Sequence, residues 1–206
     1  MSGSASLLKE LCPFCLSVCT HQVFNLAFLT DGSASIKNLN STLEAKYKSL
    51  LKTVVDFYEV SPDKTNVAVA VYSSNATTEF KLDRYYSTSI INSTIDGIVF
   101  PGMDTRIGNG LTNVRNEIFP FARKGVPNIL VTMIDGVSID EISLPSAFLK
   151  AMKVVMFSVG VGEFYAKEQL DLTSSDPDST YVLEESDFDS LPEVATQLKN
   201  SICIGE

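Results

Sequence analysis

The sequence lacks a long apolar run. No stretch of its 206 residues approaches the roughly 18 consecutive apolar residues that a membrane helix needs, so we predict no membrane insertion. The first six residues are small and polar, and they lack the basic and apolar regions of a signal peptide. We interpret them as a leader added for expression. Residues 1–18 are predicted to be an N-terminal extension, and residues 19–206 a single domain.

Basic residues and histidine are also scarce. The chain has 16 Lys and Arg against 25 Asp and Glu, which gives a formal net charge of -9. This charge argues against nucleic acid or an anionic membrane as the main partner, and favours a cation or a basic protein surface. The single histidine, His21, precedes the first predicted strand and is expected to lie on the surface, away from any nucleophile.

No phosphate-binding loop is present. Gly160-Val161-Gly162 lacks the third glycine of a dinucleotide-binding loop and comes late in the chain. We expect these glycines to let a strand and a helix pack closely instead.

Cysteine is absent from the middle of the chain. Cys12, Cys15 and Cys19 precede the first predicted strand, and Cys203 lies near the end of the last helix. Four cysteines allow three pairings, one of which joins Cys19 to Cys203 and leaves Cys12 beside Cys15. A redox pair at Cys12 and Cys15 would need a helix N-terminus to lower the thiol pKa, so a structural disulfide is favoured. A zinc site using Cys12, Cys15, Cys19 and His21 is the alternative, but it would leave Cys203 alone.

Three sequons for N-glycosylation occur, at Asn40, Asn75 and Asn92. Each is weak evidence alone. Together with the terminal cysteines they favour a secreted, extracellular protein, in which disulfide bonds persist.

Apolar runs alternate with amphipathic runs along the whole chain. Near-continuous apolar strands alternating with helices predict an α/β fold, in which a mostly parallel sheet is covered by helices on both faces. The short turn at 73–76 predicts a hairpin that adds one antiparallel edge strand. Strands are predicted at 23–29, 67–72, 77–82, 128–134, 154–159 and 181–183, and helices near 39–58, 87–97, 107–122, 140–151, 163–172 and 189–202.

Three oxygen-rich motifs follow predicted strands or precede helices. Asp31-Gly32-Ser33-Ala34-Ser35 follows the first strand, Thr105 lies in a loop before a helix, and Asp135-Gly136 follows the fourth strand. Ligands of an open α/β sheet bind at the carboxyl ends of its strands, so we expect these loops to meet. Carboxylate and hydroxyl oxygens are hard ligands that suit Mg²⁺, Mn²⁺ or Ca²⁺. The motifs therefore predict a divalent-cation site.

A simpler interpretation is that these residues are helix caps and turns, since Asp, Ser and Thr are common N-cap residues. Three loops in this order, each beside the right kind of segment, favour the cation site instead. For Asp104, which precedes Thr105, capping of the next turn is favoured over a contribution of charge to the site.

With these motifs, nearly all of residues 19–206 resembles the von Willebrand factor type A domain family, also called the integrin I-domain family. The resemblance includes the Asp31 string, the Thr105 loop running into Gly108 and Leu111, and the late strand that ends at Gly162. It also includes the segment Asp135-Gly136-Val137-Ser138-Ile139-Asp140. It implies a doubly wound, six-stranded fold.

The resemblance also implies a metal-ion-dependent adhesion site (MIDAS). Its direct or water-mediated ligands would be Asp31, Ser33, Ser35, Thr105 and Asp135. Family members typically bind a partner's carboxylate at the open metal position, and many extracellular members bind collagens or other matrix proteins. Cys19 and Cys203 look like the pair that joins the termini in some of them. The Cys12–Cys15 segment lies outside the family core, and a glycan at Asn40 would limit access to the metal loop.

These expectations lead to one main functional hypothesis. The chain is a secreted, non-enzymatic adhesion or matrix module that binds a protein ligand, with collagen-like proteins favoured, through a divalent cation. The alternative is a matrix assembly module that uses metal-independent surfaces and keeps the metal site for structure. A metal-dependent hydrolase is disfavoured, because the sequence offers no evident general base apart from carboxylates.

Overall fold

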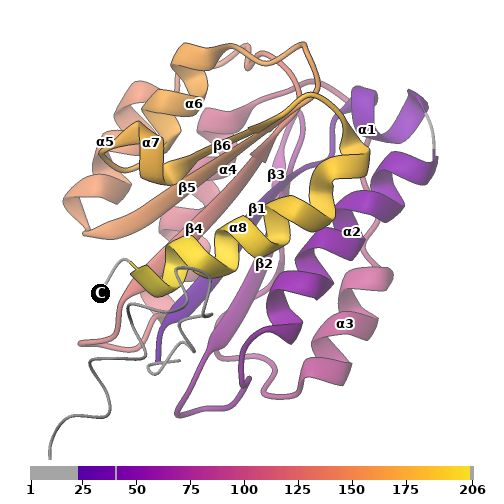
Figure 1. The fold of residues 1–206 in the computed structure, drawn as a ribbon. Coiled ribbons are helices and arrows are strands. Elements are labelled where there is room, and N and C mark those ends of the chain that lie inside the picture. Colours follow the sequence, from indigo (N-terminus) through magenta and orange to yellow (C-terminus); the bar gives the residue numbers. More distant parts are fainter. Residues whose placement is uncertain (1–22, 40, 205–206) are drawn as a thin grey trace, which may run out of the picture.

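The computed structural model describes residues 23–39 and 41–204. A six-stranded sheet with the strand order β3-β2-β1-β4-β5-β6 forms its centre (Figure 1). All neighbouring strands run parallel except β2 and β3, which form the predicted antiparallel hairpin at one edge. The strands are β1 Asn25–Asp31, β2 Asn66–Tyr72, β3 Ala76–Phe80, β4 Asn128–Ile134, β5 Val154–Val161 and β6 Val182–Glu185.

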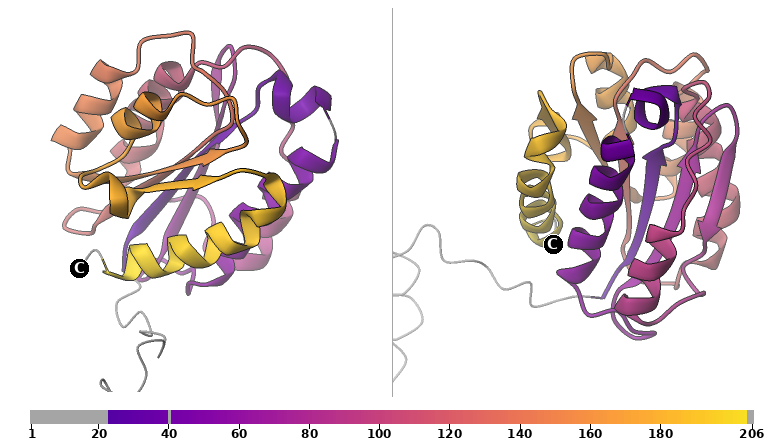
Figure 2. Two further views of the ribbon diagram at one scale, coloured as in Figure 1. Left: turned by 45° about the horizontal axis from the view of Figure 1, so that its top comes forward. Right: turned by 90° about the vertical axis from the view of Figure 1, so that its right-hand side faces the viewer.

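Helices cover both faces of the sheet, as the right-hand view of Figure 2 shows. The core on one face includes residues of α1, α2, α3 and α8, and the core on the other includes residues of α4, α5 and α6. The helices are α1 Ala34–Leu39, α2 Ser41–Asp56, α3 Thr88–Asp96, α4 Ile107–Asn113, α5 Ser143–Ala151, α6 Lys167–Thr173, α7 Asp178–Tyr181 and α8 Leu191–Ile204.

The central strands are buried on both faces, which explains their near-continuous apolar sequence. In β1, Leu26 and Phe28 belong to one core while Ala27 and Leu29 belong to the other. Successive side chains of a strand point to opposite faces, so a strand between two helical layers needs apolar residues at every position. The predicted fold class is therefore confirmed.

Several helix boundaries differ from the sequence prediction. The helix expected at 39–58 begins at Ser41, and α1 is a separate short helix that the pattern did not reveal. The helix expected at 107–122 is α4 followed by a π-helical turn, Val114–Ile118, and a 3₁₀ turn, Phe119–Phe121. Pro120 has no N–H to donate, so the regular α-helical ladder cannot continue through it. The predicted ion pair of α2 is present, with Lys48 Nζ 2.7 Å from Glu44 Oε1.

The path of the chain reverses beside β1. From β1 the chain adds β2 and β3 on one side, and it then crosses to add β4, β5 and β6 on the other. The carboxyl ends of β1 and β4 are therefore neighbours at the point where the winding changes direction. Ligands of open α/β sheets bind at this point, because the connecting loops diverge there and leave room between them.

Some predictions fall on residues outside the described ranges. Cys12, Cys15, Cys19, His21 and Asn40 lie there, and so does the side chain of Cys203. The disulfide pairings, the alternative zinc site and the glycan at Asn40 stay predictions. In the part of the chain that the structure covers, none of the helices combines the length and apolarity that crossing a bilayer requires.

Gly160 lets α6 pack closely on β5, as the sequence predicts. A Cβ atom placed on Gly160 would lie 2.6 Å from Leu170 Cδ1 and 3.1 Å from the Tyr165 ring. Leu170 is fully buried, so it has little room to move.

Gly160→Ala is therefore expected to lower the free energy of unfolding by about 1–3 kcal/mol, the usual cost of overpacking a core. Gly97→Ala is the matched control, because a Cβ atom there meets its nearest neighbour at an ordinary 3.5 Å. Urea unfolding of both variants measures the difference. Equal stability of the two variants would contradict the close packing of α6.

Candidate metal centre

Asp31 ends β1 and lies fully buried at the carboxyl edge of the sheet. The backbone N–H of Ser33 donates to Asp31 Oδ1 at 2.7 Å, and the Tyr72 hydroxyl lies 2.8 Å from Asp31 Oδ2. Tyr72 OH also lies 2.8 Å from the carbonyl oxygen of Met133, although the hydroxyl has only one hydrogen to donate. These contacts fix the orientation of the Asp31 carboxylate.

The two serines of the Asp31 motif lie side by side. Ser33 Oγ and Ser35 Oγ are 2.9 Å apart, at the start of α1. The loop is joined by backbone hydrogen bonds to the segment before Thr105: Gly102 N–H donates to Gly32 O at 2.7 Å, and Ala34 N–H donates to Met103 O at 2.9 Å. Two of the three predicted loops are therefore in direct contact.

The third loop, which begins at Asp135, contacts the Thr105 loop. Ile139 N–H donates to Thr105 O at 3.0 Å, and a Cβ atom placed on Gly136 would lie 3.7 Å from Thr105 Oγ1. Asp135 directly follows β4, the strand next to β1. The structure thus brings Asp31, Ser33, Ser35, Thr105 and Asp135 to one edge of the sheet, as the sequence predicts.

The electrostatics of this cluster favour a bound cation. Asp31 and Asp135 are 0% and 5% exposed. Burial raises the pKa of Asp31 well above its ordinary value, and the negative charge of Asp135 raises it further. Asp135 Oδ1 has no hydrogen-bond partner among the described residues, although a buried carboxylate oxygen is costly to leave unpaired. A cation would satisfy this oxygen and cancel the repulsion.

The available donors fit a hard cation. Two carboxylates and three hydroxyls supply only oxygen, the donor that Mg²⁺, Mn²⁺ and Ca²⁺ prefer. Within residues 23–39 and 41–204, no group of three His, Cys, Asp or Glu side chains is placed to hold an ion. A cation at this edge would therefore need the hydroxyls of Ser33, Ser35 and Thr105 in addition to the carboxylates.

Two buried tyrosines interact electrostatically with the carboxylate pair, and sequence reasoning missed both. The pKa values of Tyr47 and Tyr72 are raised well above normal, by burial first and then by the charges of Asp31 and Asp135. The Tyr47 hydroxyl has no hydrogen-bond partner in the described part of the chain. Both residues lie in apolar patterns that indicated only core packing.

Ser138 and Asp140 join the Asp135 loop to α4. Ser138 Oγ donates to Asp140 Oδ1 at 2.6 Å and accepts from Ile107 N–H at 2.9 Å. The Asp140 carboxylate accepts from the N–H groups of Gly108 and Asn109, at 3.0 and 2.7 Å, and so caps α4. Since Ile107 begins the helix that follows Thr105, these bonds hold the Thr105 and Asp135 loops together.

Gly108 is required at this junction. A Cβ atom placed there would lie 1.8 Å from the carbonyl oxygen of Glu141, so any other residue would push the two loops apart. The cap comes from a residue 32 positions along the chain, which the local sequence pattern cannot reveal.

The prediction that Asp104 caps the next turn is wrong. Asp140 occupies that role. Asp104 instead accepts from Ser74 Oγ at 3.1 Å and lies 3.6 Å from Arg106, while more than half of its side chain is exposed.

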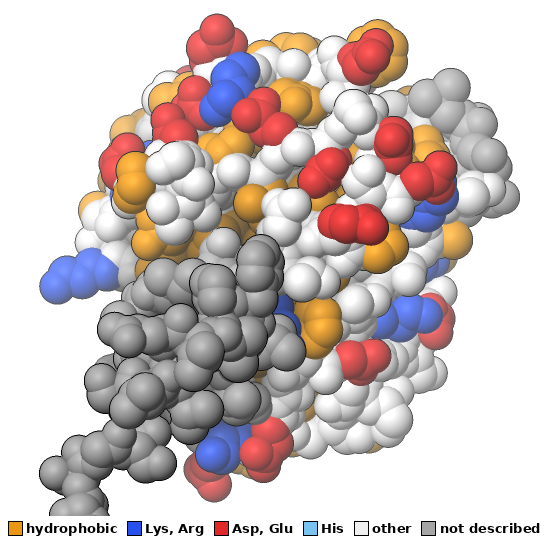
Figure 3. Space-filling view, viewed as in Figure 1, with side chains coloured by type: hydrophobic (Ala, Val, Ile, Leu, Met, Phe, Trp, Pro, Cys, Tyr) orange, Lys and Arg blue, Asp and Glu red, His pale blue; other side chains and the backbone are white. Residues whose placement is uncertain are grey.

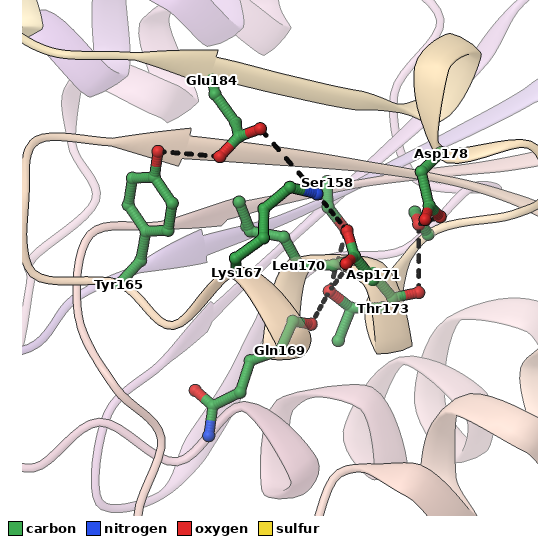
Figure 4. A network of polar contacts seen from close by, with 10 residues as sticks. Ser158, Tyr165, Lys167, Gln169, Leu170, Asp171, Thr173, Asp178 and Glu184 are labelled. Carbon is green, nitrogen blue, oxygen red and sulfur yellow. Dashed lines mark hydrogen bonds and ion pairs between the residues drawn. The ribbon is translucent and has the colours of Figure 1, made fainter.

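Gln169 connects the Asp135 loop to α6. Its side-chain amide accepts from Ser138 N–H at 2.8 Å and donates to Ser138 O at 3.2 Å. Figure 4 shows the polar contacts around Gln169 on α6. Thr173 Oγ1 lies 2.7 Å from the backbone carbonyl oxygen of Gln169 and 2.8 Å from Ser158 Oγ of β5. Lys167 pairs with Asp171 on the same helix. The loop is thus anchored to a helix that packs on β5.

The two described sequons differ in their surroundings. Asn75 is exposed in the β2–β3 turn. Asn92 is half-buried on α3, and its side-chain nitrogen, the atom that would carry a glycan, donates to Asp56 Oδ1 at 2.9 Å. Glycosylation of both stays a prediction, and Asn75 is the more accessible of the two side chains.

Comparison with known proteins agrees with this geometry. The sequence model of the von Willebrand factor type A domain matches residues 25–197. Matrilin-4 of Mus musculus is 31% identical over 191 residues, which cover 90% of this chain and 30% of matrilin-4. The collagen alpha-4(VI) chain of Mus musculus is 28% identical over 188 residues, which cover 90% of this chain and 8% of that one. The chain thus spans less than a third of these relatives.

The structure is also similar to that of proximal thread matrix protein 1 from the mussel byssus, whose MIDAS motif is occupied by zinc. The TM-score is 0.82 at 30% identity, and the match covers 89% of this chain and 47% of that protein.

The raised pKa of Asp31 predicts how stability depends on pH. Because the folded state holds this proton more tightly than the unfolded chain, the metal-free protein should lose stability as pH rises from about 4 towards the raised pKa. Asp135→Asn should reduce that loss by removing a negative charge. Saturating Mg²⁺ should raise the melting temperature of the wild type far more than that of the variant. Thermal unfolding in EDTA and in Mg²⁺ across pH tests this, and identical pH profiles in EDTA would contradict it.

Gln169→Met should weaken Mg²⁺ binding by about tenfold, because loss of the amide contacts frees the loop that positions Asp135. Gln197→Met is the control, since Gln197 is exposed on α8. Calorimetric Mg²⁺ titration measures both affinities. If the two variants bind Mg²⁺ equally well, Gln169 does not support the site.

Proposed function

The chain belongs to the von Willebrand factor type A domain family, and on that premise we propose that it is a secreted, non-enzymatic adhesion module of the extracellular matrix. It binds a protein ligand through a divalent cation, with collagen-like proteins the favoured class. Its similarity to matrilin-4 and to a collagen VI chain supports a matrix setting. We attribute the activities and partners of those longer proteins to this chain only as part of the proposal.

One observation carries the proposal: two buried carboxylates meet at the ends of adjacent strands, and Asp135 Oδ1 is unpaired among the described residues. Asp31 and Asp135 would supply the negative charge, and the hydroxyls of Ser33, Ser35 and Thr105 would complete the ligand set, directly or through water. Neutral hydroxyls leave the cation more Lewis acidic than further carboxylates would. The bound cation would offer an open position to a carboxylate of the partner.

Exposed apolar side chains beside the site support a protein ligand. Met103 precedes Thr105 by two residues, Val137 and Ile139 follow Asp135, and Phe164 follows β5 at the same edge and is 79% exposed. Apolar groups exposed around a polar centre are typical of protein interaction sites. A partner that presents a carboxylate between apolar side chains would match this surface.

The composition of the site disfavours catalysis. A hydrolase needs a general base near the metal, and both buried carboxylates of the site are assigned to the cation. Phosphate-ester turnover that disappears in Asp31→Asn would support the hydrolase alternative instead.

The second candidate is an assembly module that binds matrix through metal-independent surfaces. The observation that favours it is an exposed apolar face on α5, a helix that carries none of the predicted ligands. Binding to matrix that persists unchanged in EDTA would support this candidate.

Thr105→Ala should abolish metal-dependent binding to fibrillar collagen and leave the fold intact, because it removes one hydroxyl from a loop held by backbone contacts. Thr196→Ala, on the exposed side of α8, is the matched control and should bind like the wild type. Solid-phase binding in Mg²⁺, Mn²⁺, Ca²⁺ or Zn²⁺, and in EDTA, measures the effect. Metal-dependent binding that survives in Thr105→Ala would place the site elsewhere.

A further inference from the structure

The outer face of α5 is apolar. From Leu144 to Met152 every exposed position carries an apolar residue: Leu144, Ala147, Phe148, Ala151 and Met152. The three large side chains are 59%, 44% and 44% exposed. Their spacing of three and four residues places all five on one side of the helix. We call this set the α5 stripe.

The opposite side of α5 is already packed. Ser146 and Leu149 of the helix and Ile142 just before it are buried, and α5 contacts α4, α6 and β5. A surface helix normally combines one apolar face with one polar face, whereas a helix that is apolar on both faces is normally covered on both. Apart from Pro192 in its first turn, the exposed positions of α8 show the usual polar pattern, with Glu193, Thr196, Gln197 and Asn200. The α5 stripe is therefore an apolar surface that no other element of the described structure covers.

Two neighbouring side chains widen this surface. The Arg115 guanidinium lies 4.8 Å from the centre of the Phe148 ring, so its charge borders the stripe. Leu172 of α6 is 41% exposed, and its backbone carbonyl accepts a hydrogen bond from Ser146 of α5. α5 lies at the periphery of the molecule in Figure 1, and hydrophobic side chains are visible along that rim in Figure 3.

The stripe is complementary to itself in apolar character. Leu144, Phe148 and Met152 form a row of large residues, and Ala147 and Ala151 form a row of small residues beside it. When two such helices pack antiparallel about a two-fold axis near Ala147, the large row of each copy lies against the large row of the other, and the small row lies against the small row. The pairing therefore buries apolar side chains of both copies against each other.

The charges that flank the stripe are also self-complementary. Exposed Glu141 precedes α5, and exposed Lys153 follows it. A two-fold axis at Ala147, midway between positions 141 and 153, brings Glu141 of each copy to Lys153 of the other. A parallel arrangement would instead place like charges together at both ends. The charges therefore favour the antiparallel pair.

We propose that the α5 stripe is a self-association surface through which two copies of this chain pair with their α5 helices antiparallel. The partner surface is the same patch on the second copy, as two-fold symmetry requires. An anionic lipid surface fits less well, because the chain carries a net charge of -9.

The pairing has a geometric consequence that rests on the proposed function. α5 connects the parallel strands β4 and β5, so it runs from the carboxyl edge of the sheet, which carries the predicted metal ligands, to the opposite edge. Antiparallel α5 helices therefore point the two metal edges in opposite directions. One dimer would bridge two ligand molecules.

Analytical ultracentrifugation of the full chain, from micromolar to millimolar concentration, tests the pairing. The wild type should show a reversible monomer–dimer equilibrium, in EDTA as in Mg²⁺. Phe148→Glu should raise the dissociation constant at least about tenfold. Phe164→Glu, at a more exposed aromatic position on the metal edge, should not change it. Circular dichroism checks that each variant is folded, and non-reducing electrophoresis excludes dimers linked by disulfides.

A charge exchange tests the antiparallel geometry. Glu141→Lys and Lys153→Glu should each weaken the dimer, and the double variant should restore it. A wild type that stays monomeric at the highest concentration would overturn the proposal, as would disruption by Phe164→Glu but not by Phe148→Glu. Because the equilibrium is measured without collagen and in EDTA, its failure is distinct from a failure of the adhesion function.

Discussion

The repulsion between the two buried carboxylates, Asp31 and Asp135, governs the edge of the sheet where the predicted metal ligands lie. Asp31 is the last residue of β1, and Asp135 directly follows β4, the parallel neighbour of β1, so both carboxylates lie at the same edge of the sheet. A folded chain normally avoids two like charges away from water. Here the arrangement is supported on every side, by Tyr72, by the N–H of Ser33 and by the loops that carry Thr105 and Ser138. The fold therefore holds a cluster of negative charge ready for a cation.

Much of this arrangement could be predicted from the sequence. The five proposed ligands each lie next to the end of a buried strand or the start of a helix, where period-two and period-3.6 patterns change. The mostly parallel sheet followed from the alternation of strands and helices, and β3 was assigned to an edge by its short turn. Local patterns were sufficient because the carboxyl ends of parallel strands share one edge.

The supporting residues could not be found in this way. Gln169 contacts Ser138 across 31 positions, and Asp140 caps a helix that begins far earlier in the chain. Tyr47 and Tyr72 occupy ordinary core positions in their patterns. Tertiary packing decides which polar groups meet across the core. The periodicity of one sequence carries no information about that packing. The sequence also does not identify the metal. Oxygen ligands favour Mg²⁺, Mn²⁺ or Ca²⁺, yet a structural relative has zinc in its MIDAS motif.

The shared hydrogen of Tyr72 links two strands. Its hydroxyl lies 2.8 Å from both Asp31 Oδ2 and the Met133 carbonyl, and it can serve only one of them at a time. An ionised carboxylate is the stronger acceptor, so ionisation of Asp31 draws the hydrogen away from β4, while neutralisation returns it. The carbonyl stretching frequency of Met133 thereby becomes an internal reporter of the charge on β1, transmitted through a single rotating O–H bond.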